Sequence, residues 1–125
     1  EEFSKPPFNE KASIKKILKS LNFYHRNAKI YFAEEKNNLV GVIVFQTEQW
    51  WEGKVIIIQD LAIRERFQRQ DTGKSLMKFV ENYAMKKDAK RIYFETNRKS
   101  PAIKFYKKLG YKFNENRISM SKRLK

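Results

Sequence analysis

The segment that most constrains the fold is an apolar strand followed by a polar loop and an amphipathic helix. The strand, residues 55–63, is apolar on both faces until Gln59 and Asp60, which is typical of a central strand covered by helices on both sides. The loop, residues 67–75, runs into a helix with one apolar stripe formed by Leu76, Phe79, Val80 and Tyr83. Free N–H groups and the helix dipole would make this junction an anion-binding element, with the two phosphates of a cofactor as natural occupants. Many α/β loops with one glycine bind nothing, so binding stays open on this evidence.

One familiar motif can be excluded from this loop. Its end, Thr72-Gly73-Lys74-Ser75, resembles the end of a nucleotide-binding P-loop, G-x-x-x-x-G-K-[ST]. That motif needs its first glycine five positions before Gly73, where this chain has Gln68. The sequence therefore does not predict a P-loop nucleotide site.

The loop is also similar to the R/Q-x-x-G-x-G/A signature of the GNAT superfamily of N-acetyltransferases. Gln68 and Gly73 fit its first and last fixed positions, and Asp71 stands where the middle glycine is expected. Two flanking segments carry the resemblance further. Residues 60–63 (D-L-A-I) are similar to the family's D-L-x-V, and residues 102–111 (A-I-K-F-Y-K-K-L-G-Y) to its A-x-x-F/L-Y-x-x-L-G-F/Y. The chain is identified as a member of this superfamily from about Asn38 to the C-terminus.

The resemblance implies a three-layer α-β-α GNAT fold with a mixed, splayed central sheet. Residues 1–125 are expected to form a single domain, in which the family's N-terminal strand is missing or has diverged beyond recognition. Periodicity and caps predict helices at 9–22, 72–88 and 100–110, and strands at 28–33, 39–46, 55–63, 91–96, 111–113 and 118–120. A turn is expected at 34–38 and a loop at 49–54.

The family uses acetyl-CoA, which lies where two central strands splay apart, so acetyl-CoA is the cofactor that the resemblance implies. The backbone of Leu61, Ala62 and Ile63 is expected to hold the pantetheine arm. The pyrophosphate is expected on the backbone of the loop and the first helical turn, formed by Gln68, Arg69, Gln70, Asp71, Thr72, Gly73, Lys74 and Ser75. Asn97, or alternatively Lys99, and Tyr106 complete the predicted cofactor site.

Asp71 is the main departure from the family pattern. A β-carbon narrows the approach of the pyrophosphate, and a carboxylate beside it lowers affinity unless a cation intervenes. Asp tolerates the left-handed conformation better than most residues, and Arg69 and Lys74 are placed to offset its charge. We expect binding to survive and to be weaker than with glycine at this position.

Acetyl transfer to an amine needs a neutral nucleophile, a polarised thioester carbonyl and a proton for the leaving thiolate. The resemblance makes Tyr106 the candidate general acid; the alternative is a core aromatic like its neighbour Phe105. Asp60 and Glu95 are the candidate bases, acting directly or through water. The alternative for both is a solvated or salt-bridged carboxylate at a strand end.

The acceptor side is predicted from a weaker similarity to the polyamine or small-amine branch of the family. Residues 51–53 match its W-x-G segment, and Gln59 stands where that branch has a glutamate. Trp50, Trp51 and Gln59 are the predicted acceptor-binding residues, because aromatic rings suit cationic amines; the alternative is that one tryptophan packs under the loop. The predicted reaction is direct attack, in a ternary complex, by a primary amine of a small molecule or a protein.

The net charge of +14, from 28 Lys and Arg against 14 Asp and Glu, keeps other functions in view. Such a charge attracts nucleic acid or anionic lipid, but it is spread along the chain and no nucleic-acid motif accompanies it. A basic nucleic-acid-binding module is therefore the less favoured alternative, after a catalytically weak domain that binds acyl-CoA.

Cysteine and hydropathy narrow the remaining classes. The chain has no cysteine, and its single histidine, His25, cannot form a zinc cluster; no metal is predicted. No apolar stretch approaches the ~20 residues of a membrane span, and no secretory signal pattern opens the chain. We expect a cytoplasmic protein without a membrane partner, and a homodimer stays open.

Overall fold

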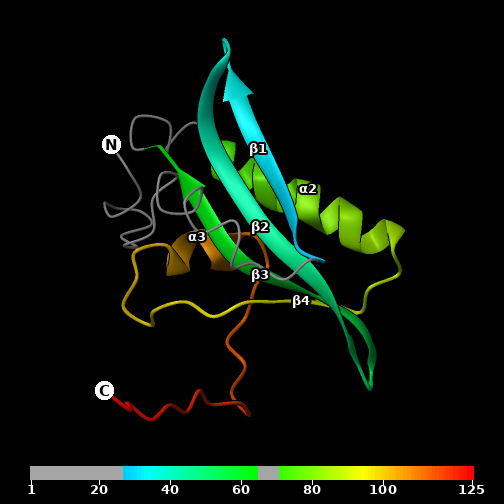
Figure 1. Ribbon diagram of the computed structural model, residues 1–125, viewed down its shortest axis with the longest axis vertical. Coiled ribbons are helices and arrows are strands. Elements are labelled where there is room, and N and C mark those ends of the chain that lie inside the picture. The colour runs from blue at the N-terminus through cyan, green and yellow to red at the C-terminus, as the bar shows by residue number, and fades with distance from the viewer. Residues whose placement is uncertain (1–26, 65–70) are drawn as a thin grey trace.

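Six elements follow one another in the computed structural model, which describes residues 27–64 and 71–125 (Figure 1). They are β1 (Lys29–Glu35), β2 (Asn38–Trp50), β3 (Gly53–Ile63), α2 (Thr72–Lys86), β4 (Arg91–Tyr93) and α3 (Ile103–Lys108). The helix predicted at 9–22 and the loop residues Gln68, Arg69 and Gln70 lie outside the described residues. Within the described part, no helix is both long and apolar enough to cross a membrane.

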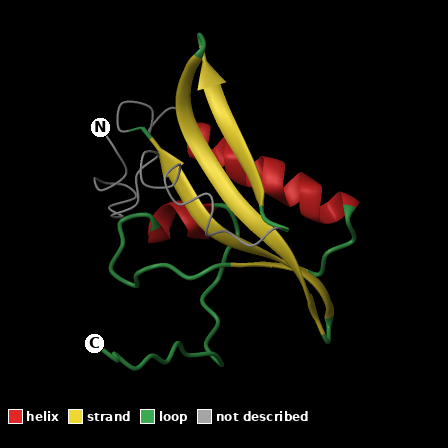
Figure 2. Cartoon of the chain, viewed as in Figure 1, coloured by secondary structure: helices red, strands yellow, loops and turns green. Residues whose placement is uncertain are grey.

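The four strands form one mixed sheet in the order β1-β2-β3-β4. The first two neighbouring pairs are antiparallel, and β3 pairs with β4 in parallel. Helices α2 and α3 both lie behind this sheet in the view of Figure 2. A parallel pair needs a crossover connection, and α2 supplies it between β3 and β4. The predicted α/β class and mixed sheet are confirmed.

The core lies where the two long strands meet α2. Four consecutive residues of β2, Val42 to Phe45, are fully buried, so both faces of the strand are covered there. From α2, the apolar stripe contributes Leu76, Met77, Val80 and Ala84 to the same cluster. Phe79, which was predicted on this stripe, is instead partly exposed and packs against Tyr31.

The hairpin between β2 and β3 corrects the predicted loop at 49–54. Both strands continue to a turn at Trp51 and Glu52, where Trp50 pairs with Gly53. Gly53 has φ +134°, a conformation that side chains rarely adopt, which lets so short a turn reverse the chain. The polar residues around the tryptophans belong to an exposed strand pair. Their polarity led to the incorrect prediction of a loop.

The C-terminal third also departs from the prediction. Strand β4 ends at Tyr93 instead of residue 96, and the segments 111–113 and 118–120 form no strand. Residues 112–125 are all exposed, so their alternating pattern has no described strand to pair with. Helix α3 begins later than predicted, although Ser100 Oγ accepts the Ala102 N–H at 3.1 Å. Gly110, at φ +98°, ends it as expected.

Gly41 supplies a test of how closely the helix lies on the sheet. A β-carbon there would meet Leu76 Cδ1 at 3.1 Å and both Ala62 O and Ile63 Cδ1 at 3.3 Å. We therefore expect Gly41→Ala to lower the free energy of unfolding by about 1–3 kcal/mol through overpacking, measured by urea denaturation. The loss should shrink in a Leu76→Ala background, where one of the three contacts is gone. An unchanged unfolding midpoint would contradict the packing argument.

Candidate active site

Strands β3 and β4 separate partway along their length, and this opening is the centre of the candidate site. They pair only at Val55–Arg91, Ile56–Ile92 and Ile57–Tyr93, whereas β3 continues to Ile63. On this edge of β3, no strand of the described residues pairs with residues 58–63. The splayed sheet was predicted, and it leaves a sheet edge long enough to hold an extended ligand by its amide groups.

A β-bulge lies at the point where the strands separate. On the β2 side, Val44 pairs with Asp60 and Phe45 pairs with Ile58, which leaves Gln59 as the extra residue. Bulges bend a strand and increase its local twist, and this one comes two residues after the last β3–β4 pair. Gln59 is exposed there, and Asp60 beside it is half-buried and engaged in an interaction.

The N-terminus of α2 carries the described half of the predicted pyrophosphate loop. Asp71 caps it with φ 63° and ψ 8°, a left-handed conformation, and its side chain makes no capping hydrogen bond. Its carbonyl accepts the Ser75 N–H at 2.9 Å. The first N–H groups of a helix have no partner within the helix itself, so we expect those from Thr72 to Lys74 to face a bound anion.

The conformation of Asp71 gives a physical reason for the glycine that the signature has at this position. A left-handed residue is strained for any side chain and least so for glycine, with Asp and Asn next. Asp71 thus adopts the left-handed conformation that glycine would adopt with less strain. That its carboxylate weakens cofactor binding stays a prediction.

Tyr106 is both packed and at a surface of the site. Its ring lies 4.6 Å from Phe94, 5.2 Å from Phe105 and 6.4 Å from Tyr111, centroid to centroid. The side chain is only 7% exposed, yet it lines a cavity of about 780 Å³ beside β4. Tyr106 is therefore a packed aromatic that also borders the cavity, and its role as general acid stays a prediction.

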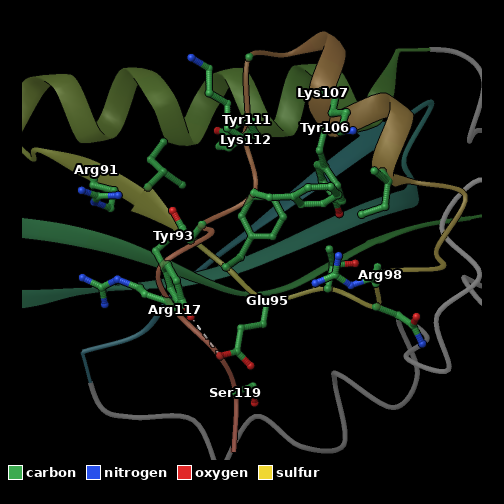
Figure 3. A pocket seen from close by; sticks show the side chains of 18 of the residues that line it. Arg91, Tyr93, Glu95, Arg98, Tyr106, Lys107, Tyr111, Lys112, Arg117 and Ser119 are labelled. Atoms are coloured by element: carbon green, nitrogen blue, oxygen red, sulfur yellow. Dashed lines mark hydrogen bonds between the residues drawn. The ribbon is translucent and has the colours of Figure 1, made fainter.

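That cavity lies along the open edge of β4, between the segment 91–98, helix α3 and the C-terminal segment (Figure 3). Its lining includes Glu95, Asn97 and Tyr106, but none of the β3 residues and neither tryptophan. Asn97, on the segment that follows β4, and Tyr106 of α3 therefore both line this cavity, and both were predicted at the cofactor.

Glu95 and Tyr106 are presented on opposite sides of that segment. Phe94 contacts Tyr106 and Tyr111 on the helix side. The Tyr93 hydroxyl instead donates a hydrogen bond of 3.0 Å to Glu95 Oε2, and Figure 3 shows Glu95 directed away from α3. One face thus carries a hydroxyl and the other a carboxylate, which suits a reaction that moves one proton out and another in.

The electrostatics of the two other tyrosines keep them protonated. Burial, above all, and then the bond to Glu95 raise the pKa of Tyr93, whereas the charge of Arg117 acts in the opposite direction. Burial and a 2.8 Å hydrogen bond to Glu81 Oε2 raise the pKa of Tyr111 far above its usual range. Neither hydroxyl releases its proton at neutral pH.

The predicted acceptor residues do not gather into one wall. Trp51 is fully exposed at the hairpin turn. Trp50 is half-buried, its ring centroid 5.5 Å from that of Tyr93, and its Nε1 donates to Glu48 Oε1 at 2.9 Å. On the cofactor side, Asn97 Oδ1 accepts the Lys99 N–H at 2.8 Å, which makes Asn97 part of a local turn.

Two residues at the site were not predicted from the sequence. Tyr93 stands two positions before Glu95, and the alternation of a strand places i and i+2 on one face. The contact between these two residues could therefore have been predicted from the sequence. Arg117, whose guanidinium carbon lies 4.8 Å from the Trp50 ring centroid, falls in an irregular segment 67 residues further on. No local signal indicates that contact.

A family model described as "Acetyltransferase (GNAT) family" matches residues 1–111. No curated protein sequence matches the chain. Among solved structures, an aminoglycoside acetyltransferase from an uncultured soil metagenomic sample is 21% identical, with a TM-score of 0.73 over 98% of this chain and 84% of that one. A glucosamine-6-phosphate N-acetyltransferase from Arabidopsis thaliana is 19% identical, with a TM-score of 0.68 over 89% and 76%.

A third solved structure has the same fold. It is a ribosomal-protein-alanine N-acetyltransferase from Brucella melitensis biovar Abortus 2308, 15% identical, with a TM-score of 0.73 over 87% of this chain and 80% of that one. At such identities the three structures support the fold alone.

Substitution of Asp71 tests the strained cap. We expect Asp71→Ala to lower the free energy of unfolding by about 1 kcal/mol, because alanine is less tolerant of the left-handed conformation, and Asp71→Gly to be at least as stable as the parent protein. Thermal and urea unfolding measure both. Ser75→Ala, inside the same helix, is the control without a left-handed residue. An alanine variant as stable as the glycine variant would contradict the assignment of strain.

Proposed function

Because this chain belongs to the acetyltransferase (GNAT) family, we propose that it moves an acetyl group from acetyl-CoA to a primary amine by direct attack in a ternary complex. One observation carries the proposal: the separation of β4 from β3 after Tyr93 leaves a sheet edge without a described strand partner, next to the N-terminus of helix α2. An extended thioester with a pyrophosphate needs those two features. The solved structures named above differ in the acceptor that their names state, so the fold leaves the acceptor open.

The residues present fit acetyl-CoA as the acetyl donor. Leu61, Ala62 and Ile63 would hold the pantetheine arm along the open edge of β3. The N–H groups that follow Asp71 would hold the pyrophosphate, with Lys74 beside them on the exposed face of α2. These contacts use backbone groups, so we expect the loop to bind the pyrophosphate with Asp71 in place of glycine.

The proton transfers fall to groups on the two faces of the segment after β4. Glu95 takes a proton from the attacking amine, directly or through water, as a C–N bond forms at the thioester carbonyl. Tyr106 supplies a proton to the sulfur as the C–S bond breaks. We prefer Glu95 to Asp60 as the base because Glu95 lines the cavity and is exposed, whereas Asp60 is half-buried outside its lining.

A thiol-release assay with acetyl-CoA and a panel of amines and peptides tests the activity as a whole. Calorimetry with acetyl-CoA separates a catalytically weak domain, which binds without turnover, from a protein that does not bind at all. Absence of both turnover and binding would overturn the proposal.

Tyr106→Phe tests the proton donor. We expect kcat to fall about 100-fold, the usual scale for loss of a general acid, while calorimetric affinity for acetyl-CoA stays within about twofold, since the ring packing against Phe94 is kept. Tyr111→Phe is the matched control, because its hydroxyl is bound to Glu81. Equal losses in the two variants would assign Tyr106 a structural role.

Glu95→Gln and Asp60→Asn distinguish the two candidate bases. We expect Glu95→Gln to lower kcat/KM by about 100-fold or more, because an amide cannot accept the proton. Asp60→Asn should lower kcat/KM by less than about tenfold. The reverse order of the two losses in the thiol-release assay would show that Asp60 is the base.

A further inference from the structure

A cation in the cavity is held by an aromatic ring instead of a carboxylate. The Arg117 guanidinium carbon lies 4.8 Å from the centroid of Trp50, and among the described residues Arg117 has no ion pair. Glu48 fixes the indole, because its Oε1 accepts Trp50 Nε1–H at 2.9 Å and its Oε2 accepts from Gln46 Nε2 at 2.8 Å. A cation–π contact positions a charge without neutralising it. Trp50 thus fixes the position of the Arg117 guanidinium, which keeps its positive charge.

A carboxylate of the same cavity is held in a matching way. Glu95 accepts its hydrogen bond from the neutral hydroxyl of Tyr93, and the Tyr93 ring packs against Trp50 with 5.5 Å between centroids. Figure 3 shows Arg117 and Tyr93 side by side, with Glu95 beyond the Tyr93 hydroxyl. The two opposite charges share one opening, and within the described part of the chain they form no ion pair with each other.

The cavity as a whole is basic. Among the described residues that line it, Glu95 is the single acidic residue, and the basic residues are Arg91, Arg98, Lys107, Lys112 and Arg117. Of these, Arg91 is paired with Glu52, Nε to Oε1, at 3.2 Å, whereas Arg98 and Lys107 lie over the ring of Phe113. The basic residues would repel a polycationic acceptor, and only Glu95 of the described lining would attract it. An anionic group would be attracted by the basic residues.

We propose that the acceptor is a small amine that also carries an anionic group, a carboxylate or a phosphate, with the anion at Arg117 and the amine at Glu95. The proposal rests on the acetyltransferase function and specifies its substrate class. A ligand that carries an anion and an ammonium group complements the charges of Arg117 and Glu95. The cavity volume of about 780 Å³ is that of a small-molecule site. Trp50 becomes a positioning residue for Arg117, in place of the acceptor wall predicted from the sequence.

Matched acceptors that differ by the anionic group alone test this substrate class. In the thiol-release assay, lysine is compared with cadaverine, and O-phosphoethanolamine with ethanolamine. We expect kcat/KM to be about tenfold or more higher for the anionic member of at least one pair, the scale of one charge-assisted contact. The pair that shows the preference distinguishes carboxylate from phosphate. No preference in either pair overturns the proposal.

Variants assign the preference to its residues. Arg117→Gln should raise KM about tenfold for the anionic acceptor and should not raise the KM of the matched acceptor that lacks the anionic group. Arg117→Lys should restore part of the loss. Trp50→Leu should also raise KM for the anionic acceptor alone, without a matching fall in kcat. Arg123→Gln is the control, since Arg123 is an exposed arginine of the same segment outside the cavity lining. A preference that survives Arg117→Gln overturns the assignment.

Direct binding separates this inference from the proposed activity. Calorimetry with O-phosphoethanolamine and with lysine, on protein saturated with CoA so that the pyrophosphate cradle is filled, should show binding that Arg117→Gln weakens about tenfold and Arg123→Gln does not. That result supports the anion site even where turnover is absent. Turnover of amines that lack an anionic group, without binding of the anionic ligands, would support the acetyltransferase activity and overturn the inference.

Discussion

The early end of the β3–β4 ladder is the constraint on which the site depends. In an unbroken parallel pair, the backbone N–H and C=O groups that face the partner strand would be hydrogen-bonded along the whole length of both strands. Here the bulge at Gln59 twists β3 away just after Tyr93, so that the same backbone becomes an open edge. Among the described residues, the chain after Tyr93 has no strand partner, and it lines the cavity. The proposed donor site and the proposed acceptor site therefore border the same segment.

The helix layer holds that free segment in place. Phe94 lies against Tyr106 and Tyr111, and the Tyr111 hydroxyl reaches across to Glu81 of α2. Helix α3 is short, and it is anchored by these rings and by the burial of Ala102 instead of by length. Aromatic packing thus holds this segment in place, whereas strand pairing holds the other edge of β3.

The sequence predicted the parts of the fold that depend on local pattern. The apolar run of β3, the stripe of α2 and the glycine that ends α3 each carry a short-range signal, and the order of the two motifs carried the family. What it missed depends on long-range partners. The hairpin tip was assigned to a loop because exposed strand pairs lack apolar alternation, and the C-terminal strands were predicted from an alternation that no described strand satisfies. The contact between Arg117 and Trp50 joins residues that are far apart in the sequence, so no local pattern predicts it.

The sheet topology has a consequence for how the molecule forms and opens. Strands β1, β2 and β3 are consecutive and antiparallel, so their pairing closes only short loops and carries little entropic cost. The β3–β4 pairing spans a whole helix and is secured at only three positions. The three-stranded meander is therefore the early and resistant part of the structure, and β4 joins it late. The segment that carries the proposed catalytic residues also has little strand pairing to lose, so we expect it to open locally while the meander stays folded.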